Sequence, residues 1–209
     1  MLEQIAKCIE TGKAKDVERL VTEALESGIS AKSILEEAMI KAMSEIGVRF
    51  KANQIFVPQV LIAARAMNMG LKVLRPALLS SGVEPIGKAI ICTVQGDMHD
   101  IGKNLVKMML EGQGIECVDL GVDVSPQKVC EAVIEHKPQI VCLSALLTTT
   151  MAAQKLIIDE LVKAGLRDKV KVMIGGAPVT QSYADEIGAD CYTPDASTCA
   201  TVACELLKN

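Results

Sequence analysis

The chain is poor in aromatic residues. Its 209 residues include two Phe, two Tyr and no Trp, so aromatics make up only 2%. Proteins that hold single-stranded nucleic acid stack its bases on aromatic faces, and this chain has almost none to offer. Basic and acidic residues number 11 and 10 up to residue 87, and 11 and 16 beyond it. Neither part carries the basic excess that a phosphate backbone requires, so we expect no nucleic-acid partner.

Long hydrophobic runs are also missing. Half of the residues are apolar, which is enough for a large core. However, no run approaches the ~18 apolar residues of a membrane-spanning helix. The N-terminal stretch MLEQIAKCIETGKAKD lacks the apolar centre of a signal peptide. We therefore expect a cytoplasmic protein that makes no contact with a membrane.

The eight cysteines form no recognisable motif. No C-x-x-C pair occurs, which argues against a zinc or redox site. Several cysteines lie inside apolar runs that are typical of strands, and the chain is too long to need disulfides for stability. We expect them to be reduced thiols that behave mostly as small apolar side chains.

The first 80 residues show only helical periodicity. Apolar residues recur at helical spacing in three segments, and Gly12, Gly28 and Gly47 mark their ends. Ser30 is a candidate N-cap for the third helix. A fourth helix is expected from about Pro58 to about Leu79. Four helices with short connections predict a small antiparallel bundle.

The pattern changes after a linker at residues 80–88. Five apolar segments predict strands at residues 88–94, 115–120, 139–144, 171–174 and 189–193. Helices are expected between and after them at 101–111, from Ser125-Pro126, at 151–164 and at 195–207. This alternation predicts a flavodoxin-like or Rossmann-like doubly wound α/β domain with a five-stranded parallel sheet. The expected domains are thus 1–87 and 88–209, and ligands should bind beyond the carboxyl ends of the strands.

The loop after the first strand contains His99, one of only two histidines. Asp97 is close enough in the chain for its carboxylate to reach a ring nitrogen, as carboxylates do beside metal-binding histidines. The alternative is a solvated or helix-capping histidine, which is our interpretation of His136. Zinc requires three or four protein ligands, and this loop offers one. A metal bound here would have to bring most of its ligands, as a macrocycle with one open axial position does.

Two more strand ends carry small or hydroxyl-bearing residues. Ser144, Thr148 and Thr150 follow the third strand, and Gly175-Gly176 follow the fourth. The hydroxyls could be ordinary helix caps, and the glycines could be an ordinary tight turn. Paired glycines can also let a ligand lie directly on the backbone. Together these residues would suit a long, slender ligand tail.

Three motifs in register resemble the signature of cobalamin-binding domains. They are Asp97-x-His99-x-x-Gly102, Ser144-x-Leu146 and Gly175-Gly176. With its helical cap, the whole chain is similar to the corrinoid module of methionine synthase. It is similar in size to the free-standing corrinoid proteins of methanol, methylamine, betaine and aryl-ether methyltransferase systems. The stretch Phe56-Val57-Pro58-Gln59-Val60 resembles the start of the cap's last helix.

The resemblance implies a role for each matching residue. His99 would be the lower axial ligand of the cobalt in cobalamin or a related corrinoid, carried as methylcobalamin and bound base-off. Asp97 would hold the other nitrogen of His99, and Thr150 would take the place of a serine that often completes this relay. The remaining implied contacts to the corrin, its nucleotide tail or its upper face are Gly96, Met98, Asp100, Gly102, Ser144, Leu146, Thr148, Gly175, Gly176, Ala196 and Phe56.

The implied function is that of a methyl carrier that does not turn over alone. Its partners would be a substrate-specific methyltransferase, an acceptor methyltransferase and a corrinoid reductive activation protein. One alternative is a cobalamin-binding subunit of an adenosylcobalamin-dependent mutase, which uses the same motifs without a helical cap. A cobalamin-sensing regulator would need a basic DNA-reading helix, and a phosphoacceptor domain would need an acidic residue where Ser144 stands.

Overall fold

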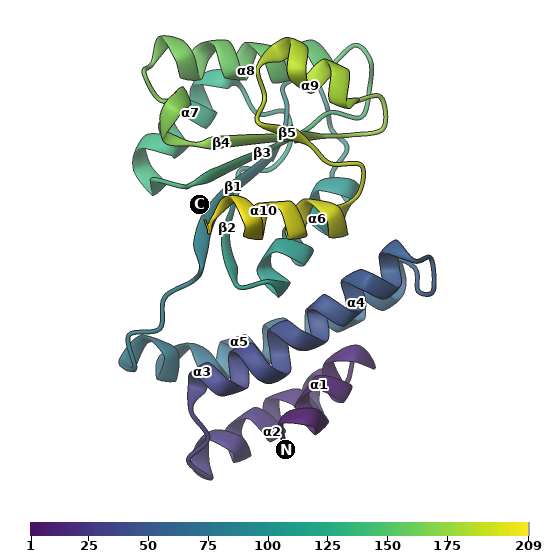
Figure 1. Ribbon diagram of the computed structural model, residues 1–209, viewed down its shortest axis with the longest axis vertical. Coiled ribbons are helices and arrows are strands. Elements are labelled where there is room, and N and C mark those ends of the chain that lie inside the picture. Colours follow the sequence, from purple (N-terminus) through teal and green to yellow (C-terminus); the bar gives the residue numbers. More distant parts are fainter. Residues whose placement is uncertain (209) are drawn as a thin grey trace. The chain divides into compact units, whose positions relative to one another are not determined.

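The computed structural model describes residues 1–208 and divides into two compact units (Figure 1). The first comprises residues 1–85 together with 112–114. The second comprises residues 86–111 and the chain from Ile115 onward. Each is described separately below.

The first unit is built from four helical segments, as predicted. They are α1 (Leu2–Glu10), α2 (Ala14–Glu26), the continuous run α3 (Ala31–Ser33), η1 (Ile34–Ile40) and α4 (Lys41–Lys51), and α5 (Val57–Ser80). Most of the apolar positions that predicted these helices are buried, among them Ile5, Val17 and Met67. Ser30 is the N-cap of the third segment, where its Oγ accepts the Ser33 N–H at 3.0 Å.

The middle of the third segment is a π-helix rather than an α-helix. Seven residues of η1 adopt it, with Ile34, Ala38 and Met39 buried. The sequence did not predict this, because the apolar spacing across the segment is that of an ordinary α-helix.

The second unit is a five-stranded parallel sheet in the order β2-β1-β3-β4-β5. Its strands are β1 (Gly87–Thr93), β2 (Ile115–Asp119), β3 (Ile140–Ser144), β4 (Lys171–Gly175) and β5 (Cys191–Tyr192). All five predicted strands are present, with ends that differ by one or two residues. The central strands β1, β3 and β4 are buried over most of their length, as strands covered on both faces must be.

Helices cover both faces of this sheet. They are α6 (Ile101–Gly112), α7 (Pro126–His136), α8 (Met151–Lys163), α9 (Gln181–Ile187) and α10 (Ala196–Leu206), with a short 3-10 turn, η2 (Arg167–Lys169). Helices α7, α8 and α9 lie on one face, and α6 and α10 lie on the other (Figure 1). The Ser125 and Asp195 side chains accept N–H groups in the first turns of α7 and α10. The doubly wound α/β fold is therefore confirmed.

The strand register aligns the segments that are expected to carry the site. Thr93 at the end of β1 pairs with Ser144 at the end of β3, and Ser144 pairs with Gly175 at the end of β4. The loops that follow these three strands consequently leave the sheet at one edge. No helix among residues 1–208 is both long and apolar enough to span a bilayer.

Candidate functional site

Asp97 lies at the centre of the site, in the loop that connects β1 to α6. Its side chain is fully buried although its neighbours Gly96 and Met98 are exposed. A turn folds the loop back on the strand, since the Asp97 N–H donates to the Val94 carbonyl at 3.1 Å. Gly96 permits this turn with a left-handed backbone at φ +83°. The carboxylate therefore points into the protein rather than into solvent.

Four donors surround this carboxylate. Oδ1 accepts Nδ1–H of His99 at 2.7 Å and the His99 backbone N–H at 3.0 Å. Oδ2 accepts the Leu146 N–H at 2.7 Å and the Thr150 hydroxyl at 2.8 Å. Burial acts to raise the pKa of Asp97, but these hydrogen bonds outweigh it and hold the pKa well below the ordinary 3.8. Asp97 is thus an anion that can only accept.

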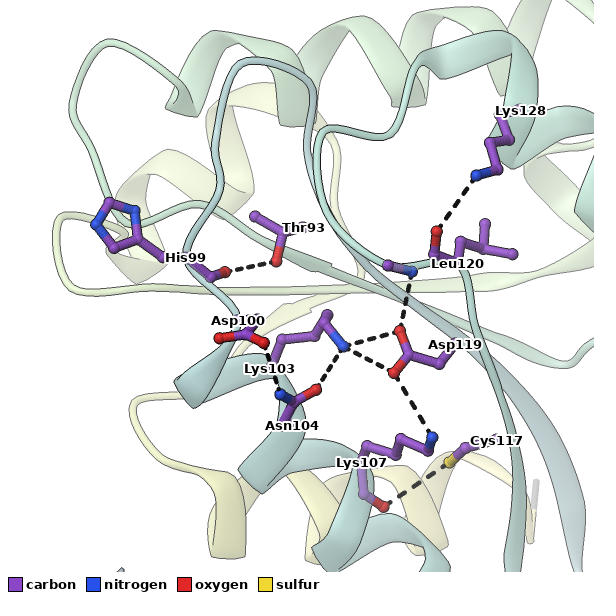
Figure 2. Close-up of polar contacts among 11 residues, drawn as sticks. Thr93, His99, Asp100, Lys103, Asn104, Lys107, Cys117, Asp119, Leu120 and Lys128 are labelled. Atoms are coloured by element: carbon purple, nitrogen blue, oxygen red, sulfur yellow. Dashed lines mark hydrogen bonds and ion pairs between the residues drawn. The ribbon is translucent and has the colours of Figure 1, made fainter.

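The imidazole of His99 is bound on one side and open on the other. Because Asp97 is ionised, the proton between the two groups belongs to Nδ1. Nε2 lies on the opposite side of the ring, and within residues 1–208 it makes no hydrogen bond. The side chain is 51% exposed, and the ring points away from the body of the unit (Figure 2). The Thr93 hydroxyl, itself buried, donates to the His99 carbonyl at 2.8 Å and fixes the backbone beneath the ring.

Thr150 joins Asp97 to the loop after β3. It is the N-cap residue of α8, yet its hydroxyl caps no N–H of that helix. It lies between the Asp97 carboxylate and the Leu147 carbonyl, at 2.8 and 3.0 Å. A hydroxyl has one proton to donate, and the charged acceptor is the stronger. The structure thus brings the predicted Asp97, His99 and Thr150 together, and it contradicts the simple helix-cap alternative for Thr150.

The other predicted residues line neighbouring strand ends or lie elsewhere. Met98, Asp100, Gly102, Leu146 and Thr148 are exposed, Ser144, Gly175 and Gly176 are half-buried, and Ala196 is buried at the start of α10. Phe56 belongs to the first unit, where it is the N-cap of α5 and is 64% exposed. Phe56 is therefore not part of the core of the first unit.

The two glycines at the end of β4, Gly175 and Gly176, differ in how closely they are packed. A Cβ atom on Gly176, whose φ is +134°, would lie 1.7 Å from the Ala145 carbonyl oxygen. A Cβ atom on Gly175 would lie 3.4 Å from the Thr193 carbonyl oxygen. By contrast, a Cβ atom on Gly102 would meet nothing within 4 Å. Gly176 is thus needed by the fold itself, whereas Gly102 borders open space.

Sequence reasoning missed several polar residues that support this site. Lys103 and Asp119 form a close ion pair beneath the His99 loop (Figure 2). Asp123 hydrogen-bonds the backbone of Gly96 and Asp97. Gln154 is buried and donates to the Leu143 and Gly175 carbonyls at the ends of β3 and β4. Their common signal is a polar residue on an otherwise apolar face or just beyond a strand, which the motif search did not weigh.

Comparison with protein families gives two matches that together span most of the chain. A family described as a B12 binding domain matches residues 87–203, and a second family with the same description matches residues 1–75. The first of these contains every predicted site residue except Phe56.

Curated relatives and a solved structure agree with this assignment. The trimethylamine corrinoid protein of Methanosarcina barkeri is 46% identical, over 86% of this chain and 84% of the relative. The dimethylamine corrinoid protein of the same organism is 41% identical, over 99% and 97%. The crystal structure of the methanol:cobalamin methyltransferase complex from M. barkeri matches with a TM-score of 0.88 at 31% identity, covering 98% of this chain and 78% of that one. The chain therefore belongs to the B12-binding corrinoid proteins of the methylamine and methanol methyltransferase systems.

Proposed function

We propose that this chain holds a corrinoid through His99 and carries a methyl group between two methyltransferases. One observation carries the proposal. The Asp97 carboxylate takes Nδ1–H of His99 at 2.7 Å and leaves Nε2 open on a half-exposed ring. A histidine that ligates a metal gives its second N–H to such a carboxylate, which sets the tautomer and raises the basicity of the ligating nitrogen.

The residues around His99 fit a flat macrocycle that brings its own metal. One imidazole suits a metal whose other ligands come from a corrin ring. Exposed apolar side chains occur in and after the His99 loop, at Met98 and Ile101, and in the loop after β3, at Leu146 and Leu147, and they could cover such a ring. Open space beside Gly102 and the hydroxyls of Ser144 and Thr148 suit the nucleotide tail of a cofactor bound base-off. No cluster of three or more His, Cys, Asp or Glu residues suited to a metal ion occurs within residues 1–208.

A bound corrinoid supplies a cobalt centre that accepts a methyl group and gives it up. The chain supplies the ligand and its control. Asp97 keeps the proton on Nδ1 and orients the ring, while the Leu146 N–H and the Thr150 hydroxyl hold Asp97.

The relatives indicate the donors and partners to test. Several are named as trimethylamine, dimethylamine or monomethylamine corrinoid proteins, so methylamines are the first donors to try. These names favour the methyl carrier over the mutase subunit. A substrate-specific methyltransferase would load the chain and an acceptor methyltransferase would unload it, while a reductive activation protein would repair the cofactor. Eight free thiols suit a reducing cytoplasm.

The test pairs the two histidines of the chain. Purified wild type, His99→Ala and the matched control His136→Ala are incubated with hydroxocobalamin, passed through gel filtration and assayed with a trimethylamine methyltransferase and an acceptor methyltransferase. We expect wild type and His136→Ala to retain the cofactor in a base-off form and to support transfer. His99→Ala should change the visible spectrum and slow transfer at least tenfold. An unchanged spectrum together with unchanged turnover in His99→Ala would refute the proposal.

A further inference from the structure

The loop that follows β2, residues 120–125, is bonded directly to the loop that carries His99. Oδ1 of Asp123 accepts the Gly96 N–H at 2.7 Å. In the opposite direction, the Asp123 N–H donates to the Asp97 carbonyl at 3.0 Å. Asp123 thus holds Gly96 and Asp97, the two residues that immediately precede Met98 and His99, although it lies 27 and 26 positions from them in the chain.

The backbone of Asp123 is unusual. Its φ is +52°, in the left-handed region that residues other than glycine seldom occupy. Asp and Asn tolerate this region better than other side chains, at a conformational cost that surrounding contacts must offset. In this conformation Asp123 makes its two hydrogen bonds to Gly96 and Asp97, and these are the contacts that can offset the cost. A strained residue whose side chain is exposed to solvent, yet bonded to the site, indicates a role in the site.

A partly buried ion pair anchors the start of the same loop (Figure 2). Nζ of Lys103, a side chain only 3% exposed, lies 2.8 Å from both carboxylate oxygens of Asp119. Oδ1 of Asp119 also accepts the Gly121 N–H at 3.0 Å. Lys103 belongs to the first turn of α6, which begins just after the His99 loop. The pair therefore ties the segment that follows His99 to the segment that precedes Asp123.

Backbone bonds connect these two anchors through β1. The Thr93 N–H donates to the Gly121 carbonyl at 3.0 Å, and the Val124 N–H donates to the Thr93 carbonyl at 3.1 Å. The Thr93 hydroxyl in turn donates to the His99 carbonyl. The loop after β2 is thus fixed at both ends, and it offers Asp123 as a rigid point of attachment for the loop that bears His99.

We propose that Asp123 is a positioning residue for His99, which it holds through the backbone of Gly96 and Asp97 in the geometry that the cobalt ligand needs. This rests on the proposed function, in which His99 is that ligand. Pre-organisation of the loop removes the cost of ordering it when the cofactor binds. Residues that orient a ligand in this way typically contribute about tenfold or more to metal affinity.

Three substitutions of Asp123 distinguish the contribution of its side-chain acceptor from that of its left-handed backbone. Asp123→Asn keeps an oxygen acceptor and tolerates the left-handed backbone. Asp123→Gly relieves the backbone strain but removes the side-chain acceptor. Asp123→Ala removes the acceptor and also tolerates the left-handed backbone poorly. Lys137→Gly is the matched control, because Lys137 is left-handed too, at φ +48°, but caps the end of α7. Each full-length variant is loaded with hydroxocobalamin and chemically reduced to the cobalt(II) form, and its urea unfolding is measured in parallel.

The readout is the fraction of cobalt that carries a protein nitrogen, taken from nitrogen splitting in the electron paramagnetic resonance spectrum of protein grown on heavy-nitrogen histidine. We expect Asp123→Asn and Lys137→Gly to match wild type. Asp123→Gly should lower both the histidine-bound fraction and the cofactor affinity, the latter about tenfold. A residue that only supports the fold would lower stability without changing the histidine-bound fraction.

A second variant tests the proposal if Asp123→Gly does not fold. Lys103→Met combined with Asp119→Leu removes the anchor without leaving a buried charge, a change that folds tolerate well. It should lower the histidine-bound fraction, as Asp123→Gly does. Wild-type coordination in folded Asp123→Gly, or in the double variant where Asp123→Gly does not fold, would overturn the inference. That outcome differs from failure of the proposed function, in which wild type itself shows no splitting from histidine.

Discussion

Oδ1 of Asp97 receives both the ring Nδ1–H and the backbone N–H of His99, at 2.7 and 3.0 Å. Two bonds from one residue to one oxygen fix the ring and its backbone as a unit. The second oxygen of Asp97 is bound to the loop after β3 through Leu146 and Thr150. One buried carboxylate therefore joins the ends of β1 and β3 and determines which nitrogen of His99 faces outward.

Removal of the Thr150 hydroxyl should destabilise the second unit. Thr150→Val keeps the shape of the side chain but removes one of the four donors to the buried Asp97 carboxylate. Hydrogen bonds to charged groups contribute about 1.5–3 kcal/mol, so we expect the free energy of unfolding to fall by about 2 kcal/mol. Urea unfolding of the cofactor-free chain measures this loss. Thr150→Ser retains the hydroxyl and should lose under about 1 kcal/mol; equal losses in the two variants would show that the bond to Asp97 does not matter.

Substitution by alanine should raise the free energy of unfolding at Gly102 and lower it at Gly176. A methyl group on Gly102 meets open space and removes a glycine from α6, so the free energy of unfolding should rise by up to about 1 kcal/mol. If the cofactor occupies that space, its affinity should fall nonetheless. In Gly176→Ala the methyl group would collide with the Ala145 carbonyl, at a cost of about 3 kcal/mol or more. Urea unfolding and hydroxocobalamin titration distinguish the two, and unaltered affinity in Gly102→Ala would exclude Gly102 from the cofactor site.

The Lys103–Asp119 ion pair should make the free energy of unfolding depend on pH in the acid range. Burial acts to raise the pKa of Asp119, but the bonds from Lys103 and from the Gly121 N–H outweigh it and lower the pKa from its ordinary 3.8. A carboxyl group whose pKa is lower in the folded state stabilises that state above its unfolded pKa, and this contribution is lost as pH falls through the folded pKa.

Asp119→Asn tests this dependence. At neutral pH it leaves Lys103 buried without its counter-charge, and we expect a loss of about 2–3 kcal/mol, at the lower end for buried pairs because Asp119 is 23% exposed. The gap between wild type and variant should then shrink as the pH falls below about 4. Urea unfolding at several pH values measures the gap. A gap that stays constant down to acid pH would mean that Asp119 does not act as an anion in the folded chain.

Most of the fold could be predicted because its signals are local. The apolar runs of β1, β3 and β4 are buried on both faces, and their alternation with helices leaves few other topologies. The seven-residue helix α9 could not be delimited, because it is too short to show helical periodicity. The π-helix η1 was missed for the opposite reason, since its apolar spacing equals that of its α-helical neighbours.

The candidate site was predictable only where its residues belong to a motif. Asp97 and His99 are two positions apart, so their contact could be expected from the chain itself. Thr150 was suggested by a resemblance, although its bond to Asp97 depends on the pairing of β1 with β3. Asp123 could not be predicted, because its side chain accepts the backbone N–H of Gly96 in another loop and its own N–H donates to the Asp97 carbonyl, and no residue type in the sequence records such contacts.

Labelled histidine tests the central claim most directly. Wild-type protein grown on heavy-nitrogen histidine is loaded with unlabelled hydroxocobalamin, reduced to the cobalt(II) form and examined by electron paramagnetic resonance. If His99 is the lower ligand, nitrogen splitting should change from a triplet to a doublet relative to unlabelled protein, and His99→Ala should lose the doublet. A triplet that persists in the labelled wild type would show that the cofactor's own base still binds cobalt, and would contradict the account.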